Sequence, residues 1–171
     1  MNTENVNGKK ALVVFHSSSG NTKKVAQAIG EALSADVEQI RPVKPFHVDI
    51  KGRGLGNFVN ISRAALGGMT ARTASIEAAQ HDPADYDLIL IGTPVYANSL
   101  PAPVRAYIKQ YRPKFKEVAF FCTGEDPDNE HIFELLEEAC GKTPCMSFPF
   151  HAPKVRADEF HSQVEAFIGR L

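Results

Sequence analysis

The chain has 171 residues, a formal net charge of −1 and 43% hydrophobic residues, which fits one globular domain spanning residues 1–171. Without a basic stripe it is a poor candidate for nucleic-acid binding, and no apolar run reaches the roughly 20 residues that a membrane span needs. The three cysteines form no CxxC pair and the histidines show no metal-ligand spacing, so we expect reduced thiols in a cytoplasmic protein with no metal site.

Apolar runs alternate with segments of helical spacing along the chain. This pattern predicts an α/β fold with a parallel sheet covered by helices on both faces. The strands are predicted at Ala11–Phe15, Asp36–Ile40, Asp87–Ile91, Glu117–Cys122 and Cys145–Phe148. The helices are predicted at Asn21–Leu33, Pro101–Tyr111, Asn129–Cys140 and Asp158–Leu171.

Two segments depart from this alternation. Residues 1–9 are polar and are expected to be flexible. Residues 41–86 are longer than a simple crossover requires, so we expect an extended crossover with an extra helix at Leu55–Leu66 and a helical turn or two at Thr73–Gln80. This crossover could form the rim of a substrate site or the surface of a homodimer.

The segment between the first strand and the first helix consists of small hydroxyl, amide and glycine residues, namely Ser17, Ser18, Ser19, Gly20, Asn21 and Thr22. The backbone N–H groups of such a loop can surround an anion, and the helix adds its own N–H groups and the positive end of its dipole. Capping the helix would need only one of these residues. Because the loop lacks both the lysine of a nucleoside-triphosphate loop and a GxGxxG dinucleotide pattern, a monophosphate fits best.

Ser17–Thr22 resembles the Ser/Thr-x-Ser/Thr-Gly-x-Thr phosphate loop of the flavodoxin family. Ile91–Tyr96, followed by Ala97–Pro103, resembles the segment that carries an isoalloxazine loop in that family. The resemblance implies a flavodoxin-like three-layer sandwich, with a five-stranded parallel sheet in the order 2-1-3-4-5 and helices on both faces. It also implies FMN at the switch point between strands one and three.

The resemblance further assigns two loops to the flavin ring. The loop after the third strand contributes Thr93, Pro94, Val95, Tyr96, Ala97, Asn98 and Ser99, with Tyr96 stacking on the ring. The loop after the fourth strand contributes Thr123 and Gly124, where glycine permits close approach of the backbone.

Near these loops, one feature departs from the family pattern and another adjoins the phosphate loop. Three acids, Glu125, Asp126 and Asp128, follow Gly124 and could cap the next helix. His16, beside the phosphate loop, is expected to pack or to form a hydrogen bond. No residue is assigned to acid–base or nucleophilic catalysis.

Bound FMN would carry the redox chemistry, while the protein would position it. Three functions stay open. The first is an NAD(P)H-dependent reductase that passes electrons to a quinone-type acceptor. The second is a one-electron carrier that docks a redox protein, although carriers of this family are usually strongly acidic and this chain is nearly neutral. The third is a non-redox binding module with weak or no FMN.

Overall fold

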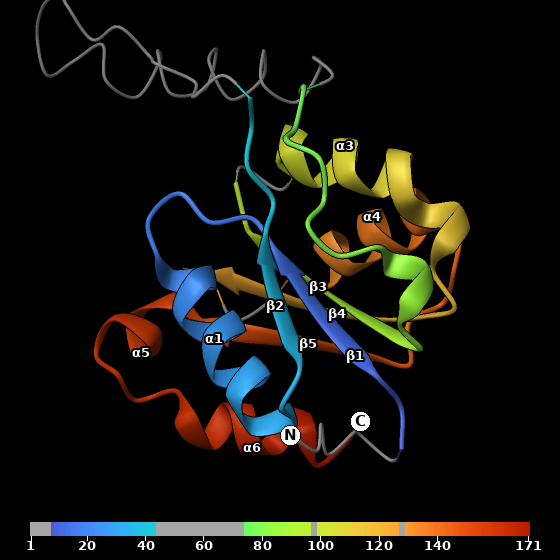
Figure 1. The fold of residues 1–171 in the computed structure, drawn as a ribbon. Coiled ribbons are helices and arrows are strands. Elements are labelled where there is room, and N and C mark those ends of the chain that lie inside the picture. The colour runs from blue at the N-terminus through green and yellow to red at the C-terminus, as the bar shows by residue number, and fades with distance from the viewer. Residues whose placement is uncertain (1–7, 44–73, 97–98, 127–128) are drawn as a thin grey trace, which may run out of the picture.

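Five parallel strands form one sheet in the order β2-β1-β3-β4-β5 (Figure 1). The structure is a computed structural model and describes residues 8–43, 74–96, 99–126 and 129–171. Its strands are β1 (Ala11–Phe15), β2 (Asp36–Gln39), β3 (Leu88–Pro94), β4 (Glu117–Gly124) and β5 (Met146–His151). The predicted fold class and strand order are confirmed.

Helices cover both faces of the sheet (Figure 1). One face carries α1 (Asn21–Leu33), α5 (Ala152–Arg156) and α6 (His161–Ile168). The opposite face carries α3 (Ala102–Tyr111) and α4 (Glu130–Cys140). No helix within the described ranges is both long and apolar enough to cross a membrane.

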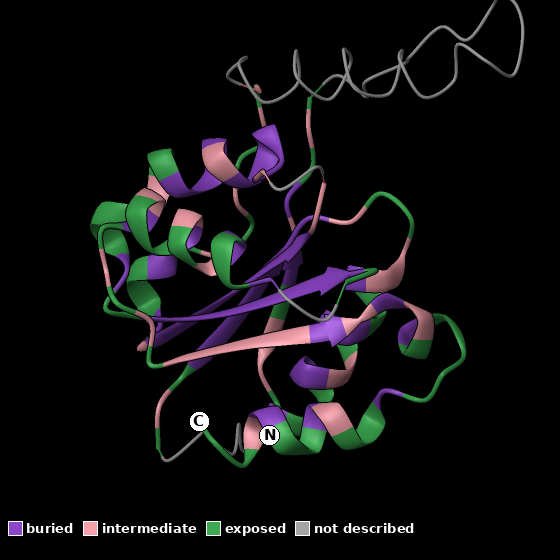
Figure 2. Ribbon diagram, turned by 180° about the vertical axis from the view of Figure 1, so that it is seen from behind, coloured by how far each residue is buried: buried purple, intermediate pink, exposed green. Residues whose placement is uncertain are grey.

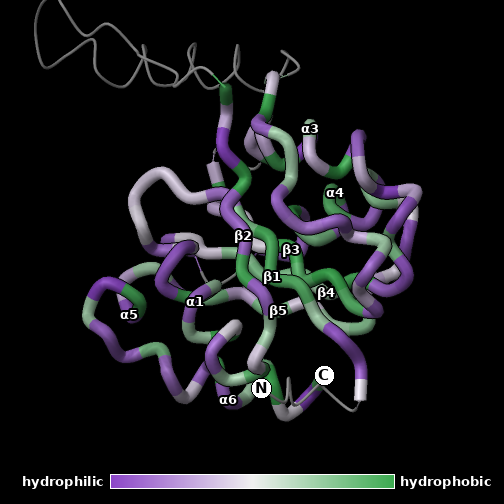
Figure 3. Tube along the Cα trace, viewed as in Figure 1, coloured by the Kyte–Doolittle hydropathy of each residue, from purple (hydrophilic) through white to green (hydrophobic). Residues whose placement is uncertain are grey.

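The apolar core lies in two layers, one on each side of the sheet. In β1, Leu12 and Val14 pack on the α3 side, whereas Val13 and Phe15 pack on the α1 side. Because β1 and β3 are covered on both faces, all of their residues are buried (Figure 2). The edge strands β2 and β5 are only partly buried, and hydrophobic residues gather along the central strands (Figure 3).

Close packing in the sheet depends on Gly92 of β3. A Cβ atom added there would lie 2.1 Å from the Phe121 ring of β4. Gly92 and Phe121 are paired across the two strands, so the aromatic ring occupies the space that any larger residue at 92 would need.

The predicted strand starts are right to within one residue, but the third, fourth and fifth strands were predicted to end too early, and the second one residue too late. β3 continues through Thr93 to Pro94, and β4 continues through Thr123 to Gly124. Thr93 and Thr123 are both buried. The first residues of both predicted loops are therefore strand residues, held by pairing between β3 and β4.

The helical turn predicted at Thr73–Gln80 is wrong for the part that the structure describes. Ile76 forms an antiparallel bridge with Pro42. On either side, the N–H of Val43 donates to Ser75 O at 2.9 Å, and the N–H of Glu77 donates to Arg41 O at 2.8 Å. We call this paired segment, residues 41–43 and 75–77, the neck.

The Glu38 carboxylate explains why the next residues are not helical. It is 6% exposed and accepts hydrogen bonds from the N–H groups of Gln80 and His81 at 2.8 and 3.0 Å. His81 Nδ1 lies a further 3.0 Å from the same carboxylate. These contacts fix the chain against β2 and override the local helical pattern.

The remaining differences are one additional helix and shifted helix ends. α5 is an additional helix that the sequence did not indicate, and α6 begins at His161 rather than Asp158. The predicted helix Leu55–Leu66 lies outside the described residues. Of residues 1–9, the structure describes Gly8 and Lys9, and Lys9 forms an ion pair with Glu117 at 2.6 Å.

Candidate functional site

The loop between β1 and α1 has the features of an anion site. Gly20 precedes the helix with φ of 94°, a left-handed conformation that glycine adopts without strain. No side chain caps α1. The polar residues of the loop are therefore not explained by capping, and the N–H groups of the first helical turn remain suited to an anionic ligand.

Two serines of this loop turn toward the loop itself. Ser17 Oγ accepts a hydrogen bond from the N–H of Gly20 at 3.1 Å. Ser18 Oγ lies 3.5 Å from His16 Nε2, whereas Ser19 is exposed. A phosphoryl group that bound the Gly20 amide would take the place of the Ser17 hydroxyl.

The His16 side chain links the loop to the end of β2. It is buried, and its Nδ1 donates to Ile40 O at 3.3 Å, which confirms the expected hydrogen-bonding role. Burial lowers the pKa of His16 below its ordinary value. A neutral imidazole with its proton on Nδ1 can accept from the Ser18 hydroxyl at Nε2. His16 therefore orders the loop without adding a positive charge to it.

The three predicted loops meet at the carboxyl edge of the sheet. Thr22 Oγ1 in the first turn of α1 lies 2.7 Å from Thr123 Oγ1 near the end of β4. The N–H of Val95 donates to Thr123 O at 3.0 Å. At Gly124, a Cβ atom would lie 2.9 Å from Asn129 Oδ1 and 3.2 Å from Val95 Cγ2. The contact between Thr22 and Thr123 joins residues that are 101 positions apart in the chain.

In the loop after β3, two hydrogen bonds join the described residues Tyr96 and Ser99. Ser99 donates to Tyr96 O through its N–H at 2.9 Å and through its hydroxyl at 3.0 Å. Thr93 is fully buried, and its hydroxyl donates to Pro94 O at 3.1 Å. Tyr96 is half-buried. The predicted site residues Ala97 and Asn98 lie outside the described residues.

The loop after β4 is held by residues that the sequence did not single out. Arg156 of α5 makes a two-pronged ion pair with the Glu125 carboxylate, at 2.5 and 2.9 Å. His151, the last residue of β5, lies with Nε2 3.1 Å from Glu125 O. Asn129 Nδ2 donates to Asp126 O at 2.7 Å. Asp128 lies outside the described residues, while Glu125 is engaged by α5 rather than acting as a helix cap.

The ion pair has a clear electrostatic effect. The hydrogen-bonded Arg156 guanidinium keeps the pKa of Glu125 below its usual value. One feature of the sequence could have indicated this ion pair. Arg156 follows the last strand and Glu125 follows the fourth, and both strands end at the same edge of a parallel sheet. Pairing them required the short helix α5, which was not predicted.

Thiol and metal chemistry are not indicated at the described part of this edge. Burial raises the pKa of Cys122 to about 12, so the thiol is protonated at neutral pH. Within the described ranges, no group of three or more His, Cys, Asp or Glu side chains could hold a metal ion.

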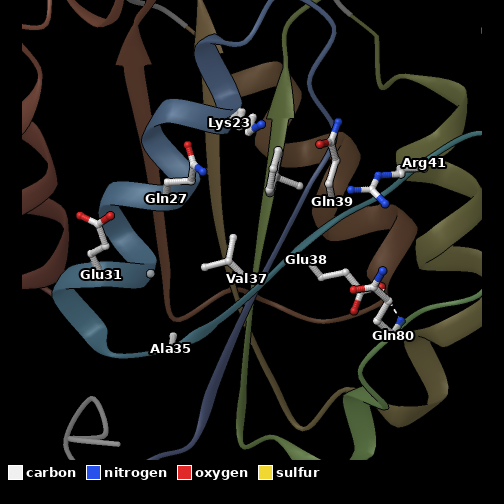
Figure 4. Close-up of a pocket in the computed structure, with 11 residues that line it drawn as sticks. Lys23, Gln27, Glu31, Ala35, Val37, Glu38, Gln39, Arg41 and Gln80 are labelled. Atoms are coloured by element: carbon white, nitrogen blue, oxygen red, sulfur yellow. Dashed lines mark hydrogen bonds between the residues drawn. The ribbon is translucent and has the colours of Figure 1, made fainter.

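A separate groove lies between α1 and β2 (Figure 4). Its volume is about 410 Å³, and its lining includes Lys23 and Gln27 of α1, Gln39 of β2, and Arg41. None of the predicted cofactor residues lines it. The groove is therefore distinct from the carboxyl-edge site described above.

Comparison with known proteins gives a consistent result. A family model described as flavodoxin matches residues 10–165. No curated protein sequence matches the chain.

Solved structures share the fold at low sequence identity. A Lactobacillus acidophilus flavoprotein in complex with FMN is 22% identical, with a TM-score of 0.65, and the match covers 88% of this chain and 98% of that one. A Bacteroides eggerthii protein proposed to be a flavoprotein is 18% identical with a TM-score of 0.67, covering 94% and 98%. Two-electron reduced Megasphaera elsdenii flavodoxin is 19% identical with a TM-score of 0.53, covering 93% and 98%.

Proposed function

Because the chain belongs to the flavodoxin family, we propose that it binds one FMN at the carboxyl edge of its sheet and works as a redox protein, with residues 1–171 acting as one domain. The observation that carries this proposal is the loop between β1 and α1. It combines a helix without a side-chain cap, a left-handed glycine, and a direct contact from Thr22 to the end of β4. The FMN complex of the Lactobacillus acidophilus flavoprotein supports the choice of cofactor.

Each of the three loops has a distinct role in this proposal. Residues 17–22 would bind the phosphate through backbone N–H groups and the Ser19 hydroxyl. Residues 93–99 would line the flavin ring, with Tyr96 stacking on it. Thr123 and Gly124 would contact the pyrimidine edge. The contacts among Thr22, Val95 and Thr123 support these roles, because they tie the three loops into one site.

The chain's own residues would bind and shield the cofactor. FMN supplies the transfer of hydride or electrons when it is bound. His16 is neutral, and Cys122 is a buried, protonated thiol. Neither side chain would therefore act as an acid, base or nucleophile toward the flavin ring. We therefore assign to the protein positioning and control of charge rather than covalent catalysis.

An NAD(P)H-dependent, quinone-type reductase is the activity we favour. The near-neutral net charge supports it, because a carrier that docks basic redox proteins gains from a strongly acidic surface. A one-electron carrier is the second candidate, favoured by the family match itself. The described cysteines, all of them free, suit the reducing conditions of the cytoplasm.

The test begins with the purified protein freed of any flavin. We expect added FMN to bind with quenching of its fluorescence, and we expect NADH or NADPH to bleach the bound flavin without oxygen. A quinone should then restore the colour. Bleaching by light and a donor dye, but not by nicotinamides, would favour the carrier, whereas failure to bind FMN would contradict both redox functions.

Size-exclusion chromatography of the loaded protein tests whether it forms a homodimer.

A further inference from the structure

We propose that Arg156 is a positioning residue of the cofactor site, which holds the loop after β4 through Glu125 and neutralises that carboxylate next to FMN. The inference rests on the proposed function and deepens it. It assigns to α5, outside the three cofactor loops, control over both the binding and the reduction of the cofactor.

The geometry shows a loop fixed from three directions. Arg156 binds the Glu125 side chain, His151 contacts the Glu125 carbonyl oxygen, and Asn129 donates to Asp126 O. A two-pronged guanidinium–carboxylate pair fixes orientation as well as distance, because both oxygens are engaged at once. The backbone that follows Gly124 is thus held by β5, α5 and the start of α4.

The charges explain why this arrangement matters for a flavin. Reduction adds negative charge to the bound cofactor, and an unpaired carboxylate nearby disfavours that change. Glu125 and Asp126 are adjacent acids, and Arg156 cancels the charge of the first. Without Arg156, two neighbouring carboxylates would stand uncompensated in a loop assigned to the pyrimidine edge.

The expected change in FMN affinity is small because the ion pair is exposed to solvent. The side chains of Arg156 and Glu125 are 50% and 71% exposed, so water and salt screen the pair. We therefore expect a change of about threefold to fivefold in FMN affinity when the pair is broken.

The experiment compares five variants of the full chain loaded with FMN: Arg156→Gln, Arg156→Lys, Glu125→Gln, the double variant Glu125→Gln/Arg156→Gln, and Lys154→Gln. Lys154→Gln is the matched control, because Lys154 lies on the same helix and is exposed, and its side chain makes no ion pair with any described residue. Dissociation constants, midpoint potentials and melting temperatures of the flavin-free protein are measured for each variant and for wild type.

Arg156→Gln should weaken FMN binding about threefold to fivefold and lower the midpoint potential. If reduced FMN is weakened fivefold more than oxidised FMN, the two-electron potential falls by about 20 mV. The double variant should return the midpoint potential close to wild type, because it removes the stranded carboxylate, whereas FMN affinity should stay reduced, because the ion pair that holds the loop is still absent. Arg156→Lys should lose less affinity and less potential than Arg156→Gln. Lys154→Gln should change neither the affinity nor the potential. In 1 M salt, the differences between the variants and wild type should become smaller.

Two outcomes overturn the inference. The first is an unchanged affinity and potential in Arg156→Gln. The second is a double variant whose midpoint potential is as low as that of Arg156→Gln, since that result would show that Arg156 does not act through the charge of Glu125. Both outcomes, in a wild-type protein that binds FMN, would overturn the inference alone. A wild-type protein that binds no FMN would overturn the proposed function together with this inference.

Discussion

The two edges of the sheet are held together by different kinds of interaction. At the amino edge, lysines meet carboxylates in three exposed ion pairs, Lys9–Glu117, Lys114–Asp82 and Lys116–Asp87, at 2.6 to 2.9 Å. At the carboxyl edge, most described contacts join hydroxyl groups and backbone, as in Thr22–Thr123 and Val95–Thr123. The ion pair between Arg156 and Glu125 also lies at that edge.

The charged contacts thus gather at one edge of the sheet, whereas mainly neutral contacts lie at the edge proposed to bind the cofactor. Exposed ion pairs are screened by salt and each adds little to stability, and none of the residues proposed to bind the cofactor takes part in the three pairs of the amino edge. Neutral N–H and hydroxyl donors at the other edge can bind a dianion without first breaking an ion pair. Four predictions test this comparison, beginning with the one expected to have the largest effect.

Ser19→Asp should weaken FMN binding about 100-fold, because a carboxylate next to a phosphate costs several kcal/mol. Ser19 is exposed in the loop between β1 and α1, so the change should not unfold the protein. Fluorescence titration with FMN measures the loss. Ser19→Asn is the uncharged control and should lose far less, while equal affinity in Ser19→Asp and wild type would argue against the phosphate loop.

Gly124→Ala should destabilise the protein by about 1–3 kcal/mol, because its methyl group would crowd Asn129 and Val95. Urea denaturation measures the change. Gly169→Ala serves as the comparison, since a Cβ atom there would meet only Glu165 O, at 3.3 Å, and the cost should be smaller. An unchanged urea midpoint in Gly124→Ala would show that the carboxyl edge is not closely packed at β4.

His16 should make the carboxyl edge sensitive to pH. Burial lowers its pKa, so the unfolded chain binds the proton more readily than the folded chain. Its contribution to stability is therefore full above the ordinary histidine pKa of about 6.5 and declines as the pH falls below that value. The loss is at most about 1.4 kcal/mol for each unit between the two pKa values.

Urea denaturation between pH 5 and about pH 8 tests this effect. In His16→Asn, which cannot titrate there, the stability should depend less steeply on pH than in wild type. Equal slopes in the two proteins would contradict the prediction, and they would assign the acid sensitivity to other groups.

Replacing Lys9, Lys114 and Lys116 together by Gln should have the smallest effect. The three ion pairs are exposed, so we expect the melting temperature to fall by a few degrees at low salt and to match wild type in 1 M salt. FMN affinity should not change. A clear loss of FMN affinity would break the separation between the two edges.

The sequence predicted the centre of the fold well because local patterns determine it. Ala11–Phe15 is a continuous apolar run, and Val25, Ile29 and Leu33 repeat every four residues, so both elements were found with the right limits. Strand ends were less predictable. Thr93 and Thr123 are polar and read as loop residues, but pairing between β3 and β4 buries them in the sheet.

Features that depend on contacts between distant residues were not predictable. Glu38 fixes residues 80–81 across more than 40 positions, and no local pattern indicates that. Arg156 and Glu125 lie 31 positions apart, and α5 is too short, with a proline in its first turn, to show helical periodicity. The loop chemistry of residues 17–22 could be read because consecutive residues carry it.

The neck is a suitable place to shorten the chain or to insert another domain. Val43 and Ser75 are joined by a backbone hydrogen bond, so the chain leaves the sheet and comes back at neighbouring positions. Two chain ends this close can be bridged by a hairpin turn or can accept a foreign domain with little added loop-closure entropy. A shortened scaffold without residues 44–73, or a sensor fusion inserted between them, would start from connection points that are already in register.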